Sequence, residues 1–66
     1  MTDLPIGSLW RSRHNEDIRM ILDVLDAHAY DSSTYLIVYY DSSHECNMTT
    51  ISSIGEWTYD WELTGT

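Results

Sequence analysis

Three histidines and one cysteine are the side chains of this sequence best suited to bind a metal ion or to act as a base or nucleophile. His44 and Cys46 flank a single residue, so both would project from the same face of a β-strand. A structural zinc site takes a full tetrahedral set of such ligands, and a nucleophilic cysteine needs a base that a third group holds in place. The sequence shows neither pattern. We therefore predict no catalytic residues, no metal site and no cofactor.

Carboxylates are the most abundant ionisable groups of the chain. Eleven Asp and Glu residues stand against three Arg and no Lys, which gives a formal charge of −8 at pH 7. A pair such as Asp60 and Glu62 acts as acid and base only inside a desolvated cleft, and a chain of 66 residues has little room for one. The negative charge also opposes contact with the phosphates of a nucleic acid. We predict that the protein is not an enzyme and does not bind nucleic acid directly.

The same charge favours a partner of opposite sign, because a negative field accelerates the encounter with a basic protein surface. We expect acidic side chains and one aromatic anchor to make the contacts, since aromatic residues dominate the energetics of interfaces. The predicted partner-binding residues are Asp23, Asp26, Asp31, Asp41, Glu45, Glu56, Asp60, Glu62 and Tyr40. Carboxylates that share one side would imitate a phosphate backbone and block a nucleic-acid-binding protein. The alternative is that the charge only keeps a small domain in solution.

These side chains must be positioned by a small number of short strands. Alternation and β-branched or aromatic content predict strands over Ser8–Arg13, Tyr35–Tyr40, Asn47–Ser52 and Trp57–Glu62. Trp57, Tyr59 and Trp61 would face inward from the last strand. Tyr35–Tyr40 is apolar on both faces, which predicts a central strand that is covered on each side. Clusters of turn-forming residues separate the strands at His14–Asp17, Tyr30–Ser33 and Asp41–Glu45.

The segment from Ile18 to Asp26 fits two kinds of element. Apolar side chains recur at helical spacing, and Asn15 would cap the helix. The same residues also alternate as they would in a strand. Periodicity alone slightly favours the helix, which leaves two architectures open at this point.

Gly7-Ser8-Leu9-Trp10-Arg11 followed by Leu36-Ile37-Val38-Tyr39-Tyr40 resembles the first and central strands of small SH3-like barrel proteins of bacteria and phages. The resemblance extends over most of the chain and ends near Trp61-Glu62-Leu63. It implies a strand over Ile18–Asp26. Many members of this family have no known function, so the resemblance implies a fold and no activity. Ser52-Ser53-Ile54 departs from the Arg-Pro pair that many relatives carry before the last strand, which weakens the case for a shared binding surface.

Six aromatic residues exceed what a core of this size requires: Trp10, Tyr39, Tyr40, Trp57, Tyr59 and Trp61. Tudor-type barrels, which are similar to the expected architecture, hold methylated lysine or arginine in an aromatic cage beside a carboxylate. Cation–π attraction would supply the binding energy, with Asp41 or Asp60 as the carboxylate. The simpler interpretation, which we favour, is that the rings form the core.

We therefore predict an all-β fold, a small SH3-like barrel of about five strands, in a single domain over residues 1–66. The alternative is an α+β fold with a helix at about 16–28 packed on an antiparallel sheet. The predicted function is an acidic, non-catalytic binding module, encoded by a phage or mobile element, that inhibits a basic nucleic-acid-handling host protein. The alternative function is assembly by self-association, as a homodimer or through strand edges. No segment resembles a membrane span or a signal peptide, so we expect a cytoplasmic protein without a membrane partner.

Overall fold

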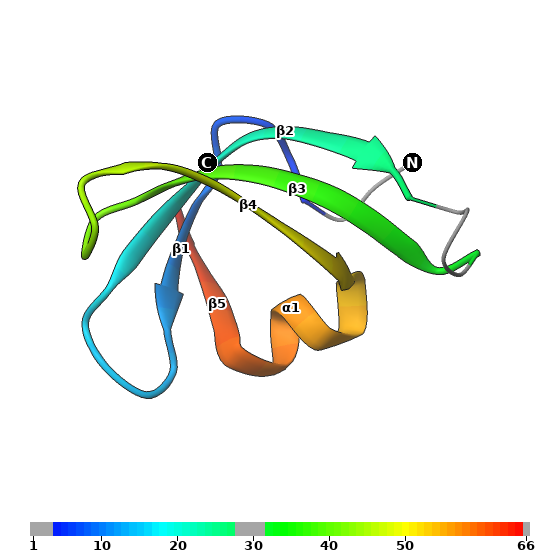
Figure 1. Ribbon diagram of the computed structural model, residues 1–66. Helices are drawn as coiled ribbons and strands as arrows, with labels where there is room; N and C mark the ends of the chain where they lie inside the picture. The colour runs from blue at the N-terminus through cyan, green and yellow to red at the C-terminus, as the bar shows by residue number, and fades with distance from the viewer. Residues whose placement is uncertain (1–3, 28–31, 66) are drawn as a thin grey trace.

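Five antiparallel strands form one sheet in the computed structural model, which describes residues 4–27 and 32–65. The strands are β1 (Leu9–Ser12), β2 (Ile18–Asp26), β3 (Thr34–Asp41), β4 (Cys46–Ser53) and β5 (Trp61–Gly65), and a short helix, α1 (Ile54–Asp60), precedes β5. The sheet order is β4-β3-β2-β1-β5 (Figure 1). The predicted all-β class is confirmed, and the order is compatible with a small SH3-like fold. Within the described ranges, no helix is long and apolar enough to cross a membrane.

The segment Ile18–Asp26 is a strand along its whole length, so the alternative of a helix in this region is wrong. It is the middle strand of the sheet and pairs with β1 on one side and β3 on the other. Ile21 and Val24 both pair with inner-face residues of β3, because an irregularity between Ile21 and Asp23 breaks the strict alternation of the strand. The resulting three-residue spacing also fits a helix. A bulge between Ile21 and Asp23 shifts the register with β3 and bends the sheet.

Two of the predicted turns lie between strands, with Asp41 itself as the last residue of β3. Tyr30 and Asp31 of the third predicted turn lie outside the described residues. β3 is an inner strand between β2 and β4, as expected for Tyr35–Tyr40. The expectation of cover on both of its faces is wrong, because Tyr40 lies exposed on the outer face.

The predicted strand over Trp57–Glu62 is wrong. Residues up to Asp60 form α1, and only Trp61 onward is strand. The Ser53 side chain accepts a hydrogen bond from the backbone N–H of Glu56, and the Glu56 carboxylate accepts one from the backbone N–H of Ser53. This capping box satisfies two backbone donors and starts the helix. Helical geometry turns Trp57 inward and leaves Tyr59 78% exposed, so Tyr59 is not an inward residue.

Ser53→Ala is expected to lower the free energy of unfolding by about 1 kcal/mol, because the first turn of α1 loses its capping acceptor. Chemical denaturation followed by tryptophan fluorescence measures this change. Ser53→Thr keeps the hydroxyl acceptor and is the matched control. A Ser53→Ala protein as stable as the parent would contradict a stabilising role for the cap.

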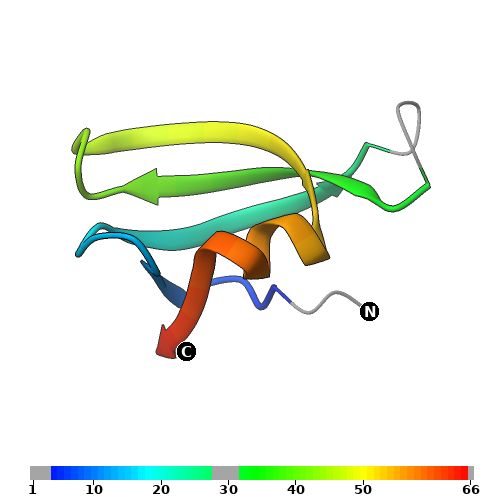
Figure 2. The same cartoon turned by 90° about the horizontal axis from the view of Figure 1, so that it is seen from below.

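The core lies on the inner side of the bent sheet, where α1 crosses it (Figure 2). Its buried apolar residues are Leu4, Trp10, Ile21, Ile37, Tyr39 and Trp57. Trp57 is 2% exposed and lies edge-to-face with Trp10 and with Tyr39, at ring-centroid distances of 6.2 and 5.6 Å. The Trp10 indole N–H donates to the Ser8 hydroxyl at 2.8 Å. One buried aromatic side chain of the helix therefore contacts both strands that flank the middle strand, β1 and β3.

The outer face of the sheet carries apolar side chains that are only partly covered. Leu25, Leu36 and Ile51 lie opposite one another on β2, β3 and β4. Leu25 and Ile51 are 47% and 46% exposed. Met20 and Tyr40 are paired farther along the same face, beyond the pair Asp23 and Val38. Such a surface is a candidate for contact with another protein.

Candidate protein-binding site

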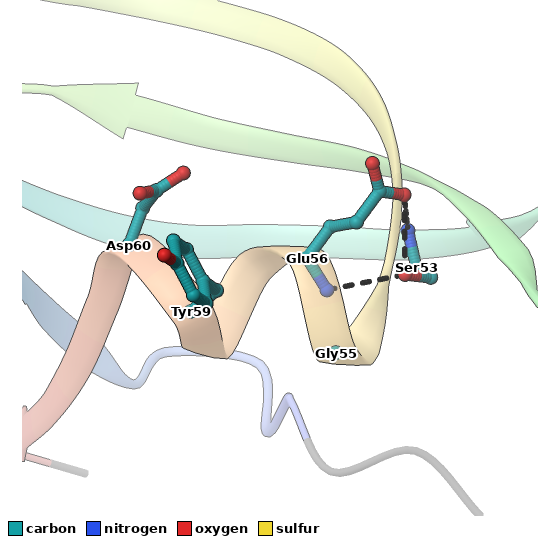
Figure 3. A pocket seen from close by; sticks show the side chains of 5 residues that line it. All are labelled: Ser53, Gly55, Glu56, Tyr59 and Asp60. Carbon is teal, nitrogen blue, oxygen red and sulfur yellow. Dashed lines mark hydrogen bonds between the residues drawn. The ribbon is translucent and has the colours of Figure 1, made fainter.

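Helix α1 presents an acidic and aromatic surface to solvent. Glu56, Tyr59 and Asp60 follow the spacing i, i+3 and i+4, which places them on one side of the helix. With Ser53 and Gly55 they line a hollow of about 470 Å³ (Figure 3). Tyr59 is the most exposed of the large hydrophobic side chains described. An exposed aromatic ring between two carboxylates is well suited to contact a cationic side chain.

A second hollow, of about 220 Å³, opens on the other side of the same two carboxylates. β4 forms one wall through Thr50, Ile51 and Ser52, and α1 forms the opposite wall through Glu56, Trp57 and Asp60. Arg19 and Trp61 complete the lining. We call this hollow the β4–α1 groove. Glu56 and Asp60 thus border two hollows.

The C-terminal end of α1 is held by the loop between β1 and β2. The backbone N–H of Arg13 donates to the carbonyl of Asp60 at 2.8 Å, and Nε of Arg13 donates to the carbonyl of Thr58 at 3.2 Å. Nε2 of His14 lies 3.0 Å from Oδ1 of Asp60. Capping at one end and these contacts at the other fix the orientation of Glu56, Tyr59 and Asp60.

Three of the aromatic residues do surround a cation, but the cation belongs to the chain itself. The Arg19 guanidinium carbon lies 4.2 Å from the Tyr39 ring centroid and 4.0 Å from that of Trp61. The Trp57 ring centroid is 5.5 Å away. Arg19 Nε also donates to Oδ2 of Asp41 at 3.3 Å. The aromatic cage considered from the sequence is therefore filled internally, and these rings pack as part of the fold.

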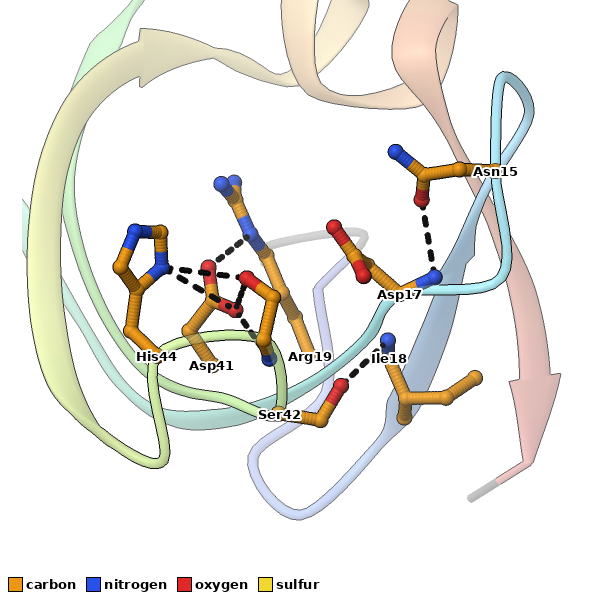
Figure 4. A network of polar contacts seen from close by, with 8 residues as sticks. Asn15, Asp17, Ile18, Arg19, Asp41, Ser42 and His44 are labelled. Carbon is orange, nitrogen blue, oxygen red and sulfur yellow. Dashed lines mark hydrogen bonds and ion pairs between the residues drawn. The ribbon is translucent and has the colours of Figure 1, made fainter.

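Asp41 does not lie on the surface, although the sequence placed it among the partner-binding residues. Its side chain is 3% exposed and binds Arg19 and the turn that follows β3 (Figure 4). Burial raises the pKa of Asp41, but hydrogen bonds from the Ser43 hydroxyl and backbone N–H and the charge of Arg19 outweigh it and lower the pKa to about 2. Asp41 is therefore a structural anion and is unavailable to a partner.

Asp41, Ser43 and His44 are neighbours, but their contacts do not follow the order of a catalytic triad. In a triad the imidazole lies between the carboxylate and the hydroxyl. Here the Ser43 hydroxyl donates directly to Oδ1 of Asp41 at 2.6 Å, and Nδ1 of His44 lies 3.1 Å from that hydroxyl oxygen. The carboxylate thus holds the hydroxyl in the turn. This arrangement stabilises the loop and does not activate a nucleophile.

Glu62 is engaged by two arginines. Oε1 of Glu62 lies 2.7 Å from Nη2 of Arg11, and Oε2 lies 3.5 Å from Nη1 of Arg13. The hydrogen bond and charge of Arg11 lower the pKa of the Glu62 carboxyl. The negative charge of Glu62 is therefore compensated within the sheet.

The other predicted partner-binding residues are dispersed. Asp23 is half-buried and accepts a hydrogen bond from the backbone N–H of Val24, and Asp26 is exposed at the end of β2. Glu45 is exposed in the β3–β4 turn, at the opposite end of β4 from α1, with a φ of 53°. Tyr40 lies on the outer face, and Asp31 falls outside the described residues. Of the predicted set, the structure brings only Glu56 and Asp60 together around a hollow.

Tyr59 and Arg19 are the site residues that the sequence reasoning missed. The signal for Tyr59 was present, because Ser53 and Glu56 have the spacing of a capping box and predict a helix that turns Tyr59 away from Trp57. Nothing in the local sequence distinguished Arg19, since its aromatic and acidic neighbours come from β3, α1 and β5.

Across residues 4–27 and 32–65, no group of three or more His, Cys, Asp or Glu side chains is placed to hold a metal ion. Comparison of the chain with protein-family models, with curated proteins and with solved structures found no match. Its function must therefore be argued from the geometry of its own side chains.

Proposed function

We propose that the protein is a non-catalytic binding module that uses the acidic surface of α1 to engage a basic segment of another protein. The observation that carries the proposal is the distribution of charge. The chain has no lysine, and each of its arginines contacts a carboxylate of the chain: Arg11 and Arg13 contact Glu62, and Arg19 contacts Asp41. Among the described residues, no arginine side chain is paired with the carboxylate of Glu56 or Asp60. The Glu56 carboxylate accepts hydrogen bonds from Ser53, that of Asp60 lies 3.0 Å from Nε2 of His14, and both residues border two hollows.

Tyr59 supports the same proposal. A tyrosine that is 78% exposed on a rigidly capped helix offers a large contact area with little side-chain entropy to lose on binding. It lies in the same hollow as the two carboxylates. Lysine and arginine have long apolar stems and charged ends, and this combination of ring and carboxylates complements both parts.

The proposal retains the basic partner expected from the sequence but not the imitation of nucleic acid. Imitation requires regularly spaced charges along one face. Asp41 and Glu62 are paired with arginines, and Glu45 lies in a distant turn. A basic, extended or flexible segment of a protein fits the compact acidic surface on α1 better than a long nucleic-acid-binding groove does.

Binding to a labelled lysine-rich peptide is expected to weaken as the NaCl concentration rises, because exposed charge–charge contacts are screened. Fluorescence anisotropy at several salt concentrations measures the effect. An acidic peptide of equal length is the control and should not bind. Either an affinity for the basic peptide that is indifferent to salt or equal binding of the two peptides would contradict the proposal.

The second candidate function is self-assembly, which the exposed apolar row of Leu25, Leu36 and Ile51 favours. Two copies of this acidic chain repel one another, so salt should strengthen their association. Sedimentation velocity at low and high salt therefore separates the two candidates by opposite salt dependence. A dimer that disappears in the Ile51→Thr variant would favour assembly.

A further inference from the structure

We infer that the β4–α1 groove binds an extended segment of the partner, which joins the sheet as an additional strand beside β4 and directs lysine or arginine side chains to Glu56 and Asp60. This inference rests on the proposed function and names the form in which the basic partner binds. It also places the contacts with the partner at the β4 edge of the sheet.

The first support is the open edge of β4. In the sheet order, β4 is a terminal strand that pairs only with β3. An edge strand directs alternate backbone N–H and C=O groups away from its neighbour, and these groups can pair with an incoming strand. Residues Thr50–Ser52 of this strand also line the groove. Backbone pairing and side-chain recognition would therefore occur in the same place.

The second support is the chemistry of the groove. Carboxylates of Glu56 and Asp60 lie along the α1 wall. Arg19 also lines the groove, but it is paired with Asp41 and lies over the Trp61 ring. Alternate side chains of a strand project to the same face, so an added strand with lysine or arginine at every second position would direct several of them toward the α1 wall.

The third support is independent of charge. Trp57 lines the groove, is 2% exposed, and its indole N–H is buried without a hydrogen-bond acceptor in the described structure. In contrast, the Trp10 indole N–H has the Ser8 hydroxyl as its acceptor. An unsatisfied buried donor is costly. This N–H is closed to solvent in the free protein, so a backbone carbonyl in the groove reaches it only when the Trp57 side chain moves outward.

A second copy of this chain is a poor occupant of the groove. It would have to supply the cations, yet the chain contains no lysine and its arginines contact Glu62 and Asp41. Charge complementarity therefore points to a different, basic chain.

The test uses an alternating Lys-Thr peptide and the indole N–H signals of the ¹⁵N-labelled protein. Binding is expected to shift the signals of Trp57 and Trp61, which line the groove, and to leave that of Trp10 in place. The same peptide with every backbone amide N-methylated keeps its charge but has no N–H donor on either edge, so it cannot pair as a strand and should bind at least about tenfold more weakly than the parent peptide. Equal affinity of the two peptides would overturn strand addition.

The second measurement compares two variants of equal net charge. Glu56→Gln with Asp60→Asn removes the groove charges, and the Gln preserves the capping box. Asp23→Asn with Glu45→Gln removes as many charges elsewhere. The groove variant is expected to weaken peptide binding about five- to tenfold, as the loss of two exposed charge contacts implies, and the control variant should change it less than about twofold.

The outcomes separate this inference from the function on which it rests. If the groove variant weakens binding of the basic peptide but the N-methylated peptide binds as tightly as its parent, the proposed function stands and strand addition is wrong. If both variants weaken binding equally, the peptide does not use the acidic surface of α1, and the proposed function fails together with the inference. If the basic peptide does not bind at all, the proposed function fails. If the protein dimerises and Trp57 and Trp61 shift without peptide, the occupant is a second copy and the inference is overturned.

Discussion

Trp57→Ala is expected to unfold most of the protein at room temperature. Removal of a buried aromatic side chain costs about 3–5 kcal/mol. A domain of this length is stabilised by only about 3–10 kcal/mol in total, at roughly 0.05–0.15 kcal/mol per residue. The Trp57 ring contacts Trp10, Tyr39 and Trp61 at centroid distances of 6.2, 5.6 and 5.8 Å, so its loss opens a cavity between the sheet and the helix.

Tyr59→Ala is the matched control for Trp57→Ala, because it removes an aromatic ring from the same helix. Tyr59 is 78% exposed, and its removal should change the free energy of unfolding by no more than about 0.5 kcal/mol. Urea denaturation followed by far-ultraviolet circular dichroism measures both variants. If the two substitutions lower the free energy of unfolding equally, Trp57 and Tyr59 are equally buried, as in a strand in which both face inward. That result would contradict the helix.

The second large effect is acid destabilisation through Asp41. Its pKa is about 2 in the folded protein against an ordinary value of 3.8. A carboxyl with a lowered pKa contributes stability that is fully present above its unfolded value and is lost as the pH falls through its folded value. The difference corresponds to about 2 kcal/mol. We expect this part of the stability to disappear between about pH 4 and pH 2.

Unfolding by urea at a series of pH values measures the acid effect, with Asp41→Asn as the control. The asparagine cannot ionise, so its stability should depend less on pH in this window. It also leaves Arg19 without its anion, as protonation of Asp41 does, so it should cost about 2 kcal/mol above pH 4. The double variant Arg19→Met with Asp41→Asn should be less destabilised than the sum of the single changes. Additive losses would show that the two side chains do not interact.

Ile18–Asp26 and α1 show how far local sequence pattern determines this fold. Both faces of the middle strand are apolar, and the period of its residues fits a helix as well as a strand. Its place between β1 and β3 decided in favour of a strand. In this extended conformation, the two neighbouring strands supply hydrogen-bond partners for its backbone groups along both edges. For the segment before β5, the alternating pattern of Trp57, Tyr59 and Trp61 favoured a strand, and the capping box with Ser53 started a helix instead.

Composition and strand patterning were sufficient to predict the inner position of Tyr35–Tyr40 and the excess of negative charge, since each depends on residue type or on a period of two. The all-β class also depended on the resemblance to SH3-like barrels, because pattern alone left Ile18–Asp26 open. Tertiary structure alone decided which carboxylates are paired with arginines. Asp41 and Glu62 meet arginines that are distant in sequence, whereas Glu56 and Asp60 lie together on a capped helix beside an open strand edge. The physical reason is that the net charge follows from the composition alone. Whether a carboxylate is paired with an arginine depends instead on contacts between distant segments, which only the fold brings together.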